Sequence, residues 1–423
     1  MGAFAAFLSS GPGGGRKKWN SIKVLCYESV MKRNTILILL ICLLAAIARA
    51  AYADSFQLSV PPLVPEQPLI SSMEEWDGRL IVVTENWLNG VHAPKRNFHY
   101  VDLKEKLIKP LIIAAGYEIM ALTEDKREAL ALCQQDGIFF IFKKFRNNDN
   151  NQWEKQQVNI QFEKDEEIRF AVNSNSYYLI NGPYIWQSRN ARQWEKIPLN
   201  KIIGERKEVN KWPNWDSPRA ILCTNDALFL GYNGGEWGGS AYVIPLNNYG
   251  LSGKGFRIGS FNVTSIKIDH NHNVWIAGGL SHLSGRYAFL FQYRNKKVTP
   301  IIDQKGFEGR NLVIKNKEAK IELPLTEING LAINNAGNPV IVASRIGVLE
   351  YSNGKISPVI AADLYITYTL PKHWVGSSPM GIVIQDDDIY IASSSLGVLE
   401  FKKKVQGYEL RQINFAKSAE ALQ

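Results

Sequence analysis

The chain has 423 residues, of which 45% are hydrophobic and 21% are charged, with 11 Trp, 17 Tyr and 18 Phe. This is the composition of a globular protein, and its aromatic residues with 33 Gly and 18 Pro favour strands and turns. Residues 1–53 carry seven of the basic residues and one acidic residue, so they account for most of the net charge of +9. The remainder has a net charge of only +3, which does not indicate a nucleic-acid-binding surface.

The N-terminal segment has the features of a signal peptide. Met31–Asn34 is positively charged, Thr35–Ala48 is an apolar run of fourteen residues, and Ala51-Tyr52-Ala53 has the small-x-small form of a cleavage site. The apolar run is shorter than the roughly 20 residues that span a bilayer, so a membrane anchor is the weaker alternative. The sequence predicts a secreted or periplasmic protein whose single mature domain comprises residues 54–423.

The mature domain reads as all-β. It contains no convincing long amphipathic helix, and its apolar runs of four to seven residues are bounded by Asn, Asp, Gly and Ser. The clearest stretch predicts a strand at Val263–Asp269, a turn at His270–Asn273 and a strand at Val274–Ala277. A glycine loop at Gly278–Leu280 and a third strand at Tyr287–Tyr293 complete it.

This stretch recurs along the chain. Glu327–Tyr351 and Gly381–Phe401 match it in order and spacing, and weaker copies precede it. The units begin near residues 69, 115, 166, 216, 261, 326 and 376. Repeats of about 50 residues are typical of four-stranded propeller blades, which bury both faces of each small sheet by packing radially. The prediction is therefore a β-propeller with seven four-stranded blades.

One unit contains Asn273-Val274-Trp275-Ile276 followed by Gly279-Leu280. In these residues it resembles the two-component-regulator type of propeller repeat. Gly347-Val348-Leu349 and Gly397-Val398-Leu399 are poorer matches that lack the tryptophan. That family includes periplasmic sensor domains and secreted proteins of unknown role, so the resemblance implies a shape more than an activity.

Cys133 and Cys223 remain after removal of the signal segment, and each ends an apolar run. In the blade alignment both follow an inner strand, in blades two and four. A disulfide is possible in an oxidising compartment, but blades two apart hold these Cα atoms beyond the roughly 7 Å that a disulfide tolerates. Two free thiols are expected.

Two acidic turns resemble metal sites. Asp269–Asn273 offers two imidazoles and a carboxylate, and Asp386–Asp388 offers three carboxylates. Both fall between predicted strands, where Asp and Asn adopt turn geometry at little cost, so solvated turns are expected in place of metal sites. No cofactor is predicted.

The loops between second and third strands and between blades lie on one face of a propeller, at the mouth of its channel. The predicted strands assign to this face the segments Thr84–Asn97, Tyr232–Ser240, Gly278–Arg286, Asn210–Ser217 and Tyr365–Ser378. The candidate binding residues are the aromatic, imidazole and carboxylate side chains of these loops: Trp87, His92, Trp212, Trp215, Glu236, Trp237, His282, His373 and Trp374. Aromatic side chains on glycine-rich backbone suit a ligand or peptide surface, and a purely structural role between blades is the alternative for each.

The sequence favours an exported, non-catalytic and monomeric binding module whose partner is an unknown protein, peptide or glycan. Walker-type and Rossmann glycine patterns, a Gly-x-Ser-x-Gly elbow and Cys-x-x-Cys are absent from the sequence. The alternative is a propeller enzyme, either a glycan lyase or hydrolase or a quinoprotein-like oxidoreductase. A hydrolase needs two carboxylates about 5–10 Å apart, for which Glu85, Glu236 and then Asp216 are the candidates. An outer-membrane assembly factor is a third possibility.

Overall fold

The computed structural model describes residues 68–86, 95–146, 152–163, 166–204, 217–235, 238–282, 285–306, 311–315, 320–324, 327–362, 364–370, 373–405 and 407–416. The chain divides into two compact units, residues 1–59 and 60–423, and every described residue belongs to the second. The predicted signal segment therefore lies outside the described residues. No helix within the described ranges has the length and apolar character needed to cross a membrane.

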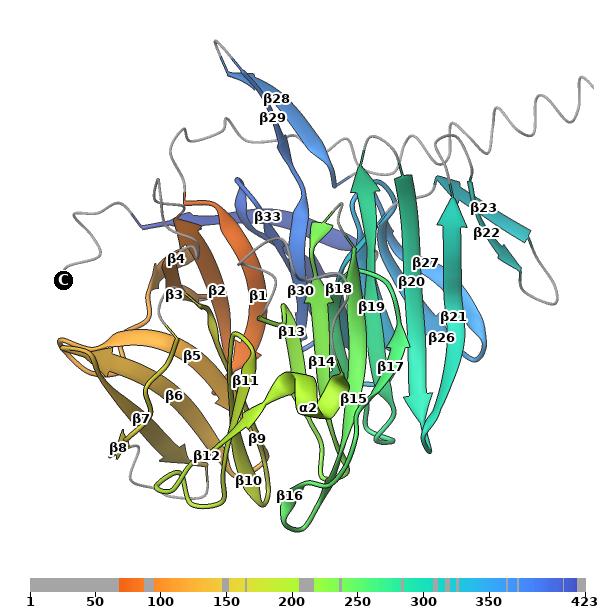
Figure 1. Cartoon of the computed structure of the whole chain (residues 1–423). Coiled ribbons are helices and arrows are strands. Elements are labelled where there is room, and N and C mark those ends of the chain that lie inside the picture. Colours follow the sequence, from red (N-terminus) through yellow and green to blue (C-terminus); the bar gives the residue numbers. More distant parts are fainter. Residues whose placement is uncertain are drawn as a thin grey trace, which may run out of the picture. The chain divides into compact units, whose positions relative to one another are not determined.

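The described residues form consecutive four-stranded antiparallel meanders (Figure 1). The first three blades are β1 (Ile70–Trp76), β2 (Arg79–Asn86), β3 (Lys95–Asp102) and β4 (Leu107–Pro110); β5 (Glu118–Glu124), β6 (Glu128–Gln135), β7 (Ile138–Phe145) and β8 (Glu154–Val158); β9 (Ile168–Asn173), β10 (Ser176–Asn181), β11 (Tyr184–Ser188) and β12 (Glu195–Pro198). The fourth blade is β13 (Ala220–Cys223), β14 (Ala227–Asn233), β15 (Gly239–Asn247) and β17 (Phe256–Gly259), with the short β16 (Gly250–Leu251) paired to the end of β15. One short helix, α2 (Leu199–Ile203), follows the third blade.

The last three blades are β18 (Val263–Ile268), β19 (Val274–His282), β20 (Gly285–Arg294) and β21 (Lys297–Gly306); β24 (Ile328–Ile333), β25 (Pro339–Ala343), β26 (Gly347–Ser352) and β27 (Lys355–Ala361); β30 (Pro379–Gln385), β31 (Asp388–Ser393), β32 (Gly397–Lys403) and β33 (Tyr408–Phe415). Two hairpins stand between blades, β22 (Asn311–Lys315) with β23 (Lys320–Pro324), and β28 (Ile366–Leu370) with β29 (His373–Ser377). The inner strands β1, β5, β9, β13, β18, β24 and β30 contact one another in sequence, and β30 contacts β1 again. The all-β propeller prediction is confirmed, and the seven units seen in the described ranges agree with the predicted number.

The core lies between neighbouring blades, which explains the continuous apolar runs of the second strands. In β19, Val274 and Ile276 pack against residues of blade 4. Trp275 and Ala277 of the same strand pack against residues of blade 6. Because successive side chains of a strand point to opposite faces, burial of both faces requires apolar residues at every position.

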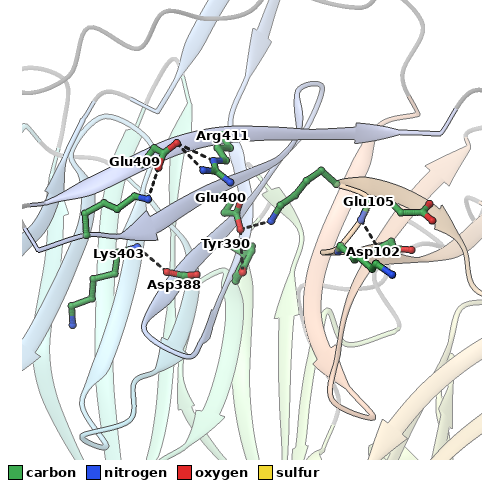
Figure 2. A network of polar contacts seen from close by, with 11 residues as sticks. Asp102, Glu105, Asp388, Tyr390, Glu400, Lys403, Glu409 and Arg411 are labelled. Atoms are coloured by element: carbon green, nitrogen blue, oxygen red, sulfur yellow. Dashed lines mark hydrogen bonds and ion pairs between the residues drawn. The ribbon is translucent and has the colours of Figure 1, made fainter.

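The first and last blades are joined without exchanging a strand. β33 pairs in parallel with β4, through Asn414 with Leu107 and Phe415 with Ile108, so the two blades form one eight-stranded sheet. Lys106 Nζ lies 2.7 Å from Glu400 Oε1, and the Glu400 side chain also accepts a hydrogen bond from the Tyr390 hydroxyl (Figure 2). We call these contacts between blades 1 and 7 the closure.

Two local predictions are wrong. The first is the loop at Gly278–Leu280, which is part of strand β19. Glycine is needed in this strand because a Cβ on Gly278 would lie 2.0 Å from the Asn262 carbonyl oxygen, and only glycine allows this close approach. Cys133 is in β6, a second strand, whereas Cys223 is in the inner strand β13, so the two positions are not equivalent. Both cysteines are nevertheless free thiols.

Candidate functional site

The inner strands share one special position at the end where they begin. A β-bulge interrupts five of them directly after their first buried residue. The bulged residues are Ser71, Met120, Thr264, Asn329 and Met380. Arg169 follows Ile168 in β9 as Met120 follows Ile119 in β5, and Arg219 directly precedes Ala220 of β13. Two adjacent blades therefore carry arginine where the others carry smaller or uncharged side chains.

A cavity of about 130 Å³ occupies the centre, lined by residues from all seven inner strands. Six of the blades place a small residue near the start of the inner strand, which lets the strands approach closely, whereas blade 3 has Phe170 after Arg169; the small residues are Ser72, Ala121, Ala220, Ser265, Gly330 and Gly381. A Cβ on Gly381 would lie 2.9 Å from the Met73 amide nitrogen, so the backbones of blades 7 and 1 nearly touch there. The cavity is thus a narrow central channel.

Charged side chains from three blades meet at one end of this channel. Arg96 Nη1 lies 3.1 Å and Arg169 Nη2 lies 2.9 Å from the same oxygen, Glu167 Oε1. Arg219 Nη1 lies 2.8 Å from Glu85 Oε1. Because Glu85 and Arg96 belong to blade 1, Glu167 and Arg169 to blade 3, and Arg219 to blade 4, these ion pairs reach across the ring. We call these five residues the channel cluster.

The channel cluster is largely removed from water. Burial works against ionisation of Glu167, but the neighbouring guanidinium groups of Arg169, Arg96 and Arg219 outweigh it and hold the pKa of Glu167 below its usual value. Burial, followed by the positive charge of Arg96, lowers the pKa of Arg169 to about 10. The positive charge of Arg169 is therefore opposed by the neighbouring guanidinium groups of Arg96 and Arg219 in a poorly hydrated site.

Two atoms of the channel cluster are buried without a hydrogen-bond partner among the described residues, Arg96 Nε and Glu167 Oε1. Glu167 Oε1 nevertheless has two guanidinium nitrogens at ion-pair distance, 3.1 and 2.9 Å away. Buried polar atoms are nearly always satisfied by protein, water or a bound species. Arg96 Nε is therefore the unused donor at this end of the channel.

The channel cluster lies at the end of the blades where β2 ends and β3 begins, because Glu85 and Arg96 flank residues 87–94. Strand direction places the starts of the inner strands, and hence Arg169 and Arg219, at the same end. This is the end of the blades to which the sequence assigned the binding loops.

The side chains of the predicted binding residues lie outside what the structure describes. Trp87, His92, Trp212, Trp215, Glu236 and Trp237 lie outside the described residues. His282 lies in β19, and His373 and Trp374 lie in β29, but the described features do not include their side chains. The predicted loop Gly278–Arg286 is wrong, because β19 extends to His282 and β20 begins at Gly285.

Of the three carboxylates predicted as candidates for hydrolysis, the structure describes one. Glu85 lies in strand β2, is buried, and is engaged by Arg219. Glu236 and Asp216 lie outside the described residues. Sequence reasoning missed Arg96, Arg169, Arg219 and Glu167; comparing the bulge position across the repeats would have revealed two of these arginines.

The acidic turns are structural. The Asp269 carboxylate accepts hydrogen bonds from the backbone N–H groups of Asn271 and Asn273 and from the side chains of Asn273 and Trp275. Burial opposes ionisation of Asp269, but these donors prevail and lower its pKa. In the other turn Asp388 accepts a hydrogen bond from the backbone N–H of Lys403. The described residues contain no group of three or more His, Cys, Asp or Glu arranged to hold a metal ion.

The sequence matches no known protein family, and no curated protein is similar to it in sequence. The extracellular domain of BT4673 from B. thetaiotaomicron aligns with 81% of this chain at 14% identity and a TM-score of 0.46, and this chain spans 40% of that domain. The Dos1 propeller aligns over 83% of this chain and 81% of its own at 12% identity, with a TM-score of 0.44. The GH74 xyloglucanase from Xanthomonas campestris aligns over 82% of this chain and 55% of its own at 10% identity, with a TM-score of 0.46. At these identities the likeness concerns the fold alone.

Proposed function

We propose that the protein is an exported, non-catalytic β-propeller that binds a ligand or a partner protein at the end of the channel that holds the channel cluster. The observation that carries this proposal is the gathering of five charged side chains at one end of the channel: Glu85 is buried, Arg96, Glu167 and Arg169 are 10–15% exposed, and Arg219 is 36% exposed. Ion pairs that are removed from water rarely add stability over apolar residues of similar volume, because desolvation offsets their attraction. A cluster of this kind, in which Arg96 Nε has no hydrogen-bond partner among the described residues, therefore supports a role in binding.

The same geometry argues against the glycan-hydrolase alternative at this position. Hydrolysis needs one carboxylic acid to donate a proton and a second carboxylate to act as base or nucleophile. Glu85 is held by Arg219, and Glu167 is held by Arg96 and Arg169. Carboxylates engaged by guanidinium groups stay ionised and are poor proton donors. Binding is thus the better use of these residues.

Export is part of the proposal and rests on Met31–Ala53. N-terminal sequencing of the protein recovered from the cell envelope or the medium tests it, with a mature start near Asp54 as the expected result. An uncleaved N-terminus on protein retained in the cytoplasm contradicts it.

Binding is tested by thermal unfolding of the purified protein with a panel of sugars, peptides, organic acids and quinones. A ligand at one hundred times its Kd adds about 2.7 kcal/mol of stability, which is easily detected. The variant Arg96→Met tests whether the ligand binds at the channel cluster. Arg189→Met is the control, since Arg189 is exposed in blade 3 and lies over the ring of Tyr249. Stabilisation lost only in Arg96→Met supports the proposal. Stabilisation retained in both variants moves the site elsewhere, and turnover of a glycan favours the enzyme alternative.

A further inference from the structure

We infer that the channel cluster binds the carboxylate group of a small monocarboxylate, such as a sugar acid or a short-chain organic acid. This inference rests on the proposed binding function and names the chemistry of its ligand. Arginine suits this role, because its planar fork of N–H donors matches a carboxylate in two-point contact.

The charge of the described channel residues favours a singly charged anion. The cluster and the cavity lining contain the cations Arg96, Arg169, Arg219 and Lys267 and the anions Glu74, Glu85 and Glu167. The balance is one positive charge. A buried site binds best when its charge is neutralised, because an uncompensated buried charge is strongly unfavourable. One carboxylate neutralises it, whereas a doubly charged phosphate leaves a negative excess.

The size of the channel agrees with a single acidic group. A water molecule occupies about 30 Å³ of liquid, so the cavity of about 130 Å³ holds roughly four waters. Pockets that enclose whole drug-sized ligands have about 300–1,000 Å³. The channel end therefore accepts the acidic group of a ligand or a very small acid, and any larger remainder of the ligand stays outside.

The exposure of the arginines indicates the path of entry. The Arg219 side chain is 36% exposed, whereas that of Arg96 is only 10% exposed. A carboxylate thus meets Arg219 first and then reaches the unsatisfied Nε of Arg96. Arg169 stays anchored, because its Nε donates to the Pro218 carbonyl oxygen at 2.8 Å while Nη2 faces Glu167.

The test is calorimetric titration of the purified protein at constant ionic strength with acetate, galacturonate, galactose and inorganic phosphate. The variants are Arg169→Met and Arg219→Met, which the fold should accept, since Met120 and Met380 show that the start of an inner strand accommodates methionine in blades 2 and 7. Arg189→Met is the matched control outside the channel. A charge-assisted hydrogen bond contributes enough that its loss should weaken binding about 10- to 100-fold. Glu85→Gln should instead tighten binding of the anions several-fold, because it adds to the positive excess.

Binding of galacturonate or acetate that exceeds binding of galactose and phosphate, and that weakens in both channel variants but not in the control, supports the inference. Binding of galacturonate without binding of acetate indicates that the ligand is a sugar acid. Similar affinity for acetate and galacturonate indicates a site for carboxylates in general. Equal affinity for galactose and galacturonate, or affinity unchanged in Arg169→Met and Arg219→Met, overturns the inference but leaves the proposed binding function in place. No binding of any of these probes also overturns it, and the wider panel with Arg96→Met then decides the proposed function separately.

Discussion

The closure makes a quantitative prediction for Lys106→Met. The Glu400 side chain is 2% exposed, and Lys106 is its ion-pair partner at 2.7 Å. Without Lys106, Glu400 keeps among the described residues a hydrogen bond of 3.4 Å from the Tyr390 hydroxyl and the more distant charge of Arg411, and its Oε2 atom already has no hydrogen-bond partner there. Breaking a buried ion pair costs about 3–5 kcal/mol, and this value falls here because the Lys106 side chain is 34% exposed and partly hydrated in the folded protein. We expect a loss of about 2–3 kcal/mol.

Urea unfolding followed by tryptophan fluorescence measures this loss, with an unchanged m-value showing that the folded state keeps its compactness. Lys403→Met is the matched control in the same sheet, since the pair of Lys403 with Asp387 is more than half exposed on both sides and such pairs contribute little. In a Glu400→Gln background the cost of Lys106→Met should shrink, because a neutral amide needs no counter-charge. Equal effects of Lys106→Met and Lys403→Met, or an undiminished cost in the Glu400→Gln background, would refute the reasoning.

Three further predictions concern buried groups. Burial lowers the pKa of His99 to about 4, so the unfolded chain binds the proton at a higher pH than the folded protein does. The free energy of unfolding should therefore be highest above about pH 6.5 and fall by up to about 3 kcal/mol towards pH 4. Urea unfolding at several pH values should show a smaller fall for His99→Leu. Gly381→Ala should cost about 1–3 kcal/mol, because its Cβ meets backbone of the neighbouring blade, whereas Gly253→Ala, whose Cβ meets nothing within 4 Å, should leave the melting temperature nearly unchanged. Burial raises the pKa of Cys133 to about 12 and raises that of Cys223 as well, so mass spectrometry should find both thiols unlabelled by iodoacetamide in the native protein and fully labelled in urea; mutual disulfide formation would contradict this.

The blade repeat could be predicted because the clearest units open with a largely apolar inner strand, an Asp or Asn turn and an apolar second strand, as in blades 5, 6 and 7. The predicted start at residue 261 precedes β18 by two residues, and the predicted start at residue 115 precedes β5 by three. Within blade 2 the prediction placed Ala129–Cys133 one strand too early. That run is more apolar than the true inner strand, Glu118–Glu124, which carries Glu118, Thr123 and Glu124 at its ends.

The channel cluster could not be predicted, for a reason of distance along the chain. Arg219 and Glu85 are separated by 134 residues, and they meet only when the ring brings blades 1 and 4 to opposite sides of a narrow channel. The search for function from sequence favoured aromatic and glycine-rich loops such as Gly234–Gly239, because their composition is unusual within one local stretch. Arg169 in β9 and Arg219 directly before β13 have no unusual local sequence around them when each is considered alone.

The repeats themselves show that the arginines exceed what the fold requires. At the bulge position of blade 5, the Thr264 hydroxyl donates at 2.8 Å to the carbonyl oxygen of Ile328, the residue that precedes the bulge of the next blade. In blade 3, Arg169 Nε donates to the carbonyl oxygen of Pro218, the equivalent residue of blade 4. A threonine hydroxyl therefore suffices for the bond between blades, and the terminal guanidinium nitrogens of Arg169 are additional. These nitrogens reach the channel, where most other blades place a small residue near the start of the inner strand. There they add a positive charge that the packing of the blades does not require. Glu167 is shared by Arg169 and Arg96, and Glu85 is engaged by Arg219, so the cluster keeps one positive charge, which the anion proposed above would neutralise.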